Sequence, residues 1–367
     1  MSNKSENKNS ALKVNKGVEQ PSSVNPYAAK HFQKVKQELL SADEYIKGIQ
    51  AGNRTLLSKA ITLVESSLPK HQEIAQQIIE QCIQYAGKSI RLGITGVPGV
   101  GKSTFIESLG IYLTGQGHQL AVLAIDPSSE KTKGSILGDK TRMEKLSVDK
   151  NAFIRPSPSA GSLGGVARKT KEIIILCEAA GFDTIFVETV GVGQSETAVH
   201  SMVDFFLLLM LAGAGDELQG IKRGIMEMAD ALVINKADGD NIKKANLAQL
   251  EYKNALHLFP PSESGWIPTV NTCSSLNNKG IKDVWKVIED YRELTKKNNY
   301  FQQRRQQQEL KIFFDSIGEK LKDHFYNNTD VKDQLITIKS KIVEGKISSY
   351  QAGNILLDTY YQSVKKD

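Results

Sequence analysis

Hydrophobic residues follow two different periods along the chain. Between residues 89 and 293, short apolar runs of strand type alternate with stretches whose apolar residues recur at helical spacing. Continuous apolar strands between helices indicate a parallel sheet that is covered on both faces. We therefore predict an α/β fold with a doubly wound, mostly parallel sheet, whose strands span residues 90–95, 120–126, 152–155, 183–188, 204–211, 230–235 and 267–272.

The stretches on either side of residues 89–293 are helical. Apolar residues recur at i, i+4 and i+7 over residues 31–88, which predicts an N-terminal helical segment. The helical pattern of residues 294–367 predicts a C-terminal helical arm. Within this arm, 302–308 are polar on all sides, as expected for a helix that spans solvent or bridges to a partner. Residues 1–30 are rich in Ser, Asn and Lys, and we interpret them as a disordered tail.

Composition narrows the classes of function. The 47 basic and 41 acidic residues give a net charge of only +6 without a compact basic block, so we expect no nucleic-acid partner. No apolar run approaches the ~20 residues of a membrane span, so we expect no membrane contact. Residues 1–30 carry neither a secretory signal nor an Arg-rich transit signal. Three widely separated cysteines suit a reducing compartment, and we expect a cytoplasmic protein.

Residues 96–103 read GVPGVGKS, which is the P-loop pattern G-x-x-x-x-G-K-[ST]. A predicted strand precedes the motif and a predicted helix follows it. The glycines let backbone N–H groups surround phosphate oxygens at the helix N-terminus. There Lys102 would reach the β- and γ-phosphates and Ser103 would hold Mg²⁺. The alternative is a Gly-rich turn without a ligand. The predicted nucleotide-binding residues of this loop are Gly96, Val97, Pro98, Gly99, Val100, Gly101, Lys102, Ser103 and Thr104.

Two later segments predict which base is bound. The tetrapeptide N-K-A-D follows a strand and supplies Asn235, Lys236 and Asp238. The Asp238 carboxylate can accept hydrogen bonds from both the ring N–H and the exocyclic amine of guanine, whereas adenine would leave it unpaired at a cost of about 1–3 kcal/mol. By itself the tetrapeptide is weak evidence for guanine binding, because polar turns often contain these residues. The strand at 267–272 leads into a loop that resembles the one closing over the guanine O6, with Ser274, Ser275 and Leu276. We predict GTP or GDP as the bound nucleotide.

Five further stretches make the resemblance to one family specific. They are DPSS at 126–129, GSILGDKTR at 134–142, RPSPS at 155–159, ETVGVGQSE at 188–196 and AGAGDELQGIK at 212–222. Together with the P-loop they resemble the methylmalonyl-CoA mutase-associated GTPases, the MeaB/ArgK-type proteins related to human MMAA. The resemblance covers roughly residues 38–345. It implies a chaperone GTPase that protects and loads an adenosylcobalamin-dependent acyl-CoA mutase, with methylmalonyl-CoA mutase as the expected partner. It also implies that the C-terminal arm mediates a homodimer.

Two carboxylates at strand ends are candidate ligands of Mg²⁺. Asp126 and Glu188 end predicted strands at the sheet edge where ligands collect. Together with the Ser103 hydroxyl they supply the oxygen ligands that Mg²⁺ prefers. In the alternative, either carboxylate caps a helix or pairs with a lysine. Asp139 lies in a Gly-rich loop and could position the metal or the attacking water, or could serve as a plain N-cap. The predicted catalytic residues are Lys102, Asp126, Asp139 and Glu188.

The segment after Glu188 bears on the rate of hydrolysis. Gly191 stands where Ras-like GTPases have the glycine of D-x-x-G, but Gln194 lies three residues after that glycine instead of directly after it. We can name no arginine finger within the chain. Weak intrinsic hydrolysis that a partner raises is therefore expected. The family resemblance implies an additional switch that senses the mutase, and the alternative is a solvated loop. The switch residues are Asp216, Glu217, Gln219 and Lys222.

Two other functions fit parts of the pattern. A metallochaperone GTPase for nickel or cobalt enzymes would need a Cys/His cluster, whereas the cysteines and the six histidines of this chain are scattered. A transport-linked kinase would use ATP, whereas the N-K-A-D tetrapeptide favours guanine. Among acyl-CoA mutases, isobutyryl- and ethylmalonyl-type enzymes are alternatives to methylmalonyl-CoA mutase.

Overall fold

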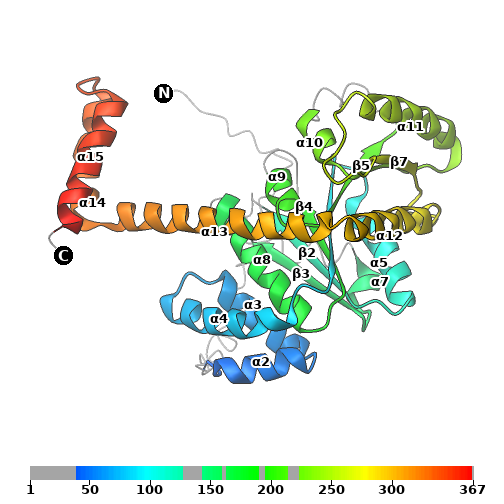
Figure 1. Ribbon diagram of the computed structural model, residues 1–367, viewed down its shortest axis with the longest axis horizontal. Helices are drawn as coiled ribbons and strands as arrows, with labels where there is room; N and C mark the ends of the chain where they lie inside the picture. The colour runs from blue at the N-terminus through cyan, green and yellow to red at the C-terminus, as the bar shows by residue number, and fades with distance from the viewer. Residues whose placement is uncertain (1–38, 127–142, 159–162, 190–194, 214–222, 366–367) are drawn as a thin grey trace, which may run out of the picture. The chain divides into compact units, whose positions relative to one another are not determined.

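The computed structural model describes residues 39–126, 143–158, 163–189, 195–213 and 223–365, and Ser41–Asp367 forms one compact unit. A sheet with helices around it lies at its centre (Figure 1). The sheet has seven strands in the order β3-β2-β4-β1-β5-β6-β7. Every strand pairing is parallel, which confirms the predicted fold class. The strands are β1 Ile90–Gly96, β2 Leu120–Asp126, β3 Ala152–Pro158, β4 Thr184–Thr189, β5 Phe205–Leu211, β6 Ala231–Asn235 and β7 Thr269–Thr272.

Crossover helices explain why the central strands are continuously apolar. Parallel neighbours need a connection that leaves the sheet and returns, and the helices of these connections cover the strands. All residues of β1, β4 and β6 are buried as a result. The helices between the strands are α5 Lys102–Gly115, α7 Glu144–Ser147, α8 Leu163–Ala179, α9 Ser195–His200, α10 Arg223–Met228 and α11 Ile242–Leu256, with the short 3-10 helix η3 Gly239–Asn241 before α11.

Three N-terminal helices pack against α8. They are α2 Ala42–Gln50, α3 Arg54–Glu65 and α4 Pro69–Cys82, followed by the short 3-10 helix η1 Ile83–Tyr85. The Ser41 hydroxyl and the Glu44 carboxylate form a capping box that fixes the start of α2. Arg155 of β3 forms an ion pair with Glu65 at 2.5 Å, which ties α3 to the edge of the sheet. The predicted tail at 1–30 lies outside the described residues.

The polar stretch 302–308 is the clearest correction to the sequence-based expectations. It belongs to α13 (Tyr300–Asn327), but Arg304, Arg305 and Gln308 are buried instead of facing solvent. Arg305 donates to the Asp204 carboxylate at 2.7 and 2.6 Å, and Arg304 lies 3.5 Å from the Asp230 carboxylate. These aspartates immediately precede β5 and β6. The start of α13 is therefore fastened to the sheet by charges, which a hydrophobic pattern cannot reveal.

The C-terminal helices have a small hydrophobic core of their own. α12 (Ile281–Lys297) leads into α13, and the chain ends with α14 (Thr329–Val343) and α15 (Ser349–Val364) (Figure 1). Val331 and Ile338 of α14 pack with Ala352 and Leu356 of α15. The domain boundaries proposed near residues 88 and 293 stay predictions. Among the helices of the described ranges, none is long and apolar enough to cross a membrane.

Candidate nucleotide site

The P-loop connects the end of β1 to the start of α5, as the sequence predicts. Gly96 has a φ of +155°, and a Cβ there would lie 2.5 Å from the Leu209 carbonyl oxygen. Gly101 has a φ of +90° and is the N-cap of α5. Only glycine adopts these conformations without strain, and at Gly96 only glycine fits the space. The loop therefore has the tight backbone path that presents N–H groups at a helix N-terminus.

Lys102 is held within this loop. Its Nζ donates to the Gly96 carbonyl oxygen at 2.8 Å. Burial lowers the pKa of Lys102, whereas the nearby carboxylates of Glu188 and Glu196 act in the opposite direction. A phosphate group in the loop would give this ammonium a charged partner in place of a carbonyl.

The carboxylates near Lys102 come from β4 and α9. Glu188 is buried, and β4 places it in register between Ile94 of β1 and Ala124 of β2. Glu196 is buried in the first turn of α9. Glu196 is a residue of the site that the sequence did not predict. Its position just after the segment that contains Gly191 was the signal that could have indicated it. Glu188 and Glu196 both contribute negative charge at the site of the Lys102 ammonium.

Of the other predicted catalytic carboxylates, Asp126 and Asp139, the structure describes only the backbone of Asp126. Asp126 ends β2, which is two strands from β1 and hence about 10 Å away across the sheet. Its backbone lies at the same edge of the sheet as the P-loop, and its side chain is outside the described part. Asp139 and the switch residues Asp216, Glu217, Gln219 and Lys222 also lie outside the described residues.

Asn235 joins three parts of the site. Its Nδ2 donates to the Val100 carbonyl oxygen of the P-loop at 2.9 Å. Its Oδ1 accepts from the backbone N–H of Ser275 at 3.2 Å and from the Ser275 hydroxyl at 2.8 Å. The end of β6, the P-loop and the loop after β7 are thus linked through one buried amide.

Lys236 and Asp238 shape the outer part of the same site. Lys236 has a left-handed φ of 59°, and its Nζ donates to the Gly99 carbonyl oxygen at 2.8 Å. The Asp238 carboxylate accepts from the Ser274 hydroxyl at 2.5 Å. These groups border a cavity of about 250 Å³, whose lining is Gly101, Thr104, Asn235, Lys236, Asp238, Ser275 and Leu276. The three segments that the sequence assigned to phosphate and guanine therefore meet around one cavity.

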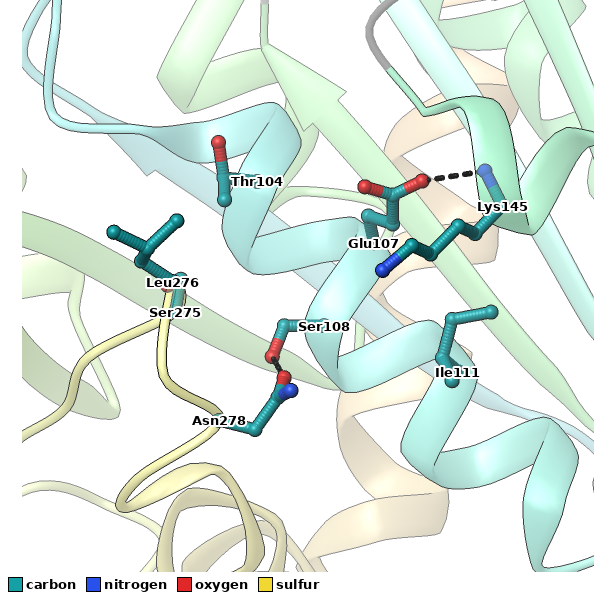
Figure 2. A pocket seen from close by; sticks show the side chains of 8 residues that line it. All are labelled: Thr104, Glu107, Ser108, Ile111, Lys145, Ser275, Leu276 and Asn278. Atoms are coloured by element: carbon teal, nitrogen blue, oxygen red, sulfur yellow. Dashed lines mark hydrogen bonds between the residues drawn. The ribbon is translucent and has the colours of Figure 1, made fainter.

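A second cavity of about 160 Å³ adjoins the first along α5 (Figure 2). It shares Thr104, Ser275 and Leu276 with the first cavity. Figure 2 shows Glu107, whose carboxylate accepts from the Lys145 backbone N–H at 2.8 Å. Ser108 and Asn278 form a hydrogen bond on the other side. A nucleoside that extends from the first cavity along α5 would therefore meet polar groups.

This fold and site define a P-loop GTPase. The family model described as "Methylmalonyl Co-A mutase-associated GTPase MeaB" matches residues 57–330, and the chain belongs to this family. It is 44% identical to the GTPase ArgK of Escherichia coli over 322 residues, which cover 87% of this chain and 97% of that protein. It is 44% identical to the mitochondrial methylmalonic aciduria type A homolog of Mus musculus over 328 residues, covering 87% of this chain and 79% of that protein.

A solved structure agrees with the fold. The crystal structure of an LAO/AO transport system kinase superposes with a TM-score of 0.70 at 37% sequence identity, covering 88% of this chain and 99% of that one. The chain is a GTPase that binds a guanine nucleotide, and its family is named for association with a mutase.

Proposed function

We propose that this GTPase gates the loading of adenosylcobalamin and protects or reactivates a B12-dependent acyl-CoA mutase, methylmalonyl-CoA mutase above all. The observation that carries the proposal is the match of the mutase-associated GTPase family over residues 57–330. The assembled phosphate and base segments support it, because gating needs a bound nucleotide. The proposal places the protein in the cytoplasm, where its three free, buried cysteines would stay reduced.

Mg²⁺ is the metal that the proposed reaction uses. The donors fit it: Ser103 supplies a hydroxyl at the start of α5, and Glu188 supplies a buried carboxylate at the neighbouring strand end. Asp126 would act through water across the intervening strand. When bound, Mg²⁺ neutralises charge on the phosphates. Lys102 adds a second positive charge, and Asp139 would position the metal or the attacking water.

Hydrolysis by the chain alone would be slow, and the partner would raise its rate. The loop with Asp216, Glu217, Gln219 and Lys222 follows β5, the strand that pairs with β1 and leads to the same edge of the sheet. A protein docked on that loop would therefore lie near the γ-phosphate. Its binding energy would order the loops that complete the catalytic site.

A homodimer formed through the C-terminal arm is the second part of the proposal. Five apolar residues of α13 have side chains that are between 40% and 66% exposed, namely Leu310, Phe313, Phe314, Ile317 and Leu321. An apolar stripe of this kind on a helix marks an interaction surface. A second copy of the same stripe would cover it in a two-fold arrangement. Phe314→Asp should give a monomer that still binds GDP, and a dimer in sedimentation would rule the stripe out.

The mutase assignment is tested by capture from native lysate. The protein would be immobilised once with a GTP analogue and once with GDP, and bound proteins would be identified by mass spectrometry. We expect a B12-dependent acyl-CoA mutase, retained differently in the two nucleotide states. Lys102→Ala is the matched control, because it should lose the nucleotide dependence. Recovery of no B12-dependent enzyme in any state would refute the proposal.

A further inference from the structure

A cavity of about 370 Å³ lies at the edge of the sheet opposite the P-loop. It is formed by the segment before β1, the end of α12 and the start of α13. β1 separates it from the P-loop, and seven residues of strand span roughly 23 Å. The cavity is therefore distinct from the nucleotide site. Its lining residues are Gly87, Lys88, Ser89, Arg292, Lys296, Asn299, Phe301 and Gln302.

Three of the lining residues are cationic, and two of them repel each other. Arg292 and Lys296 are four residues apart on α12, so they lie on the same face, where like charges destabilise a helix. Burial lowers the pKa of Lys296, and the positive charges of Arg292 and Arg305 lower it further, against a smaller opposing effect of Asp204. The Nε of Arg292 is buried and has no hydrogen-bond partner within the described residues. An anion in the cavity would relieve the repulsion between Arg292 and Lys296.

Two carboxylates near this cavity, those of Asp204 and Glu178, are already committed to other groups. Asp204 accepts two hydrogen bonds from Arg305 and one from the backbone N–H of Arg91 at 2.8 Å. Glu178 accepts from the Arg91 guanidinium at 3.0 and 3.1 Å and from the Gly87 backbone N–H at 2.6 Å. In the described ranges, Lys88, Arg292 and Lys296 form no ion pair. The cavity thus keeps an excess of positive charge.

The start of α13 adds to this positive field. Asn299 is the N-cap of this 28-residue helix, its side chain makes no capping hydrogen bond, and the first turn contains no acidic residue. The first turn of α13 therefore supplies no negative side chain of its own to complement the helix dipole. Phe301 and Gln302 of the same turn line the cavity.

We propose that this cavity binds a small anion of the diphosphate class. Three cations call for more than one negative charge on the ligand, and the volume falls within the range of small-molecule sites. Diphosphate oxygens would accept from the Arg292 guanidinium and from the ammonium groups of Lys88 and Lys296. The bound anion would join the start of β1 to the junction of α12 and α13. This proposal does not depend on which mutase the protein serves.

Isothermal titration calorimetry of the full chain with inorganic diphosphate tests the site. Saturating GDP and excess Mg²⁺ keep the P-loop occupied. We expect one diphosphate per chain, and Arg292→Gln or Lys296→Gln should each weaken it by about tenfold. Lys88→Gln gives a third test should either variant fold poorly, which circular dichroism would reveal. Lys297→Gln is the matched control, because Lys297, like Lys296, is exposed on α12 but does not line the cavity.

Two outcomes would overturn the proposal: no binding at millimolar diphosphate, or equal affinity in the wild type and in all the variants. A second titration, with ADP, distinguishes two possible sources of the diphosphate group: an organic diphosphate ester and free diphosphate. Tighter binding of ADP than of inorganic diphosphate, lost in Arg292→Gln, would support an organic diphosphate ester as the ligand. Weaker binding of ADP, with the same dependence on Arg292, would support free diphosphate.

Discussion

Replacing Asn235 with alanine should disconnect the P-loop from the base-binding loops. The amide donates to the Val100 carbonyl oxygen and accepts from the backbone N–H and the hydroxyl of Ser275. Asn235 and Ser275 are both buried, so water cannot readily replace the lost partners. The variant therefore leaves at least two buried backbone groups unpaired, one in each of the segments that the amide joins.

The expected loss of stability can be estimated from these two backbone groups. An unpaired buried backbone group costs about 1–3 kcal/mol, and some of this cost is recovered when the loops relax. We expect Asn235→Ala to lower the free energy of unfolding of the nucleotide-free protein by about 2–4 kcal/mol. GDP should also bind at least tenfold more weakly, which corresponds to about 1.4 kcal/mol, because both halves of the cavity lose their common support.

Urea unfolding with and without GDP measures both effects. A ligand that binds only the folded state stabilises it according to its affinity, so the gain from GDP should be smaller in the variant. Asn241→Ala is the matched control, because its Nδ2 donates to the Lys236 carbonyl oxygen at an exposed position. If Asn235→Ala and Asn241→Ala unfolded at the same urea concentration and bound GDP equally well, the cross-linking role of Asn235 would be refuted.

Three other predictions concern the base, the metal and pH. Asp238→Asn should bind GTP at least a hundredfold more weakly and gain affinity for xanthosine triphosphate, whose carbonyl replaces the amine; unchanged GTP affinity would defeat the guanine assignment. Glu188→Gln should need at least tenfold more Mg²⁺ for half-maximal turnover, and an unaltered Mg²⁺ titration would remove Glu188 from the metal. Burial, with the positive charge of Arg304 nearby, lowers the pKa of His200 from 6.5 to about 3. Below pH 6.5 the unfolded chain therefore binds a proton that the folded chain excludes, and the wild type loses stability as the pH falls. Relative to His200→Gln, this loss should reach up to about 1.4 kcal/mol per pH unit, measured by urea unfolding. A difference between the two proteins that stays constant with pH would contradict this assignment.

The sheet and the nucleotide motifs could be predicted because their signals are local. Each strand is a continuous apolar run, and the glycines at 96 and 101 reflect backbone conformations that other residues avoid. The segment after β6 lies beside the P-loop because parallel strands meet at one edge of the sheet. The link that Asn235 makes to Val100 was not predicted, because its partner is 135 residues away.

The start of α13 could not be predicted for the same reason. Arg305 pairs with Asp204, which is 101 residues away, and a polar stretch gives no sign of a distant buried partner. This pairing decides how the dimer should be tested. Truncation of the chain near residue 298 would remove the guanidinium that pairs with the Asp204 carboxylate, and loss of one partner of such a pair costs about 3–5 kcal/mol. A point substitution such as Phe314→Asp is therefore the better test of the dimer.

Stimulation of GTP turnover by methylmalonyl-CoA mutase tests the central claim most directly. The measurement compares phosphate release by the wild type, Asp216→Ala and Lys222→Ala, each with and without the purified mutase. We predict slow turnover alone and a clear rise with the mutase in the wild type. Both variants should bind GTP within a few-fold of the wild type but respond weakly to the mutase, because in our proposal their loop serves the partner rather than the phosphates. Equal turnover of the wild type with and without the mutase would contradict the account.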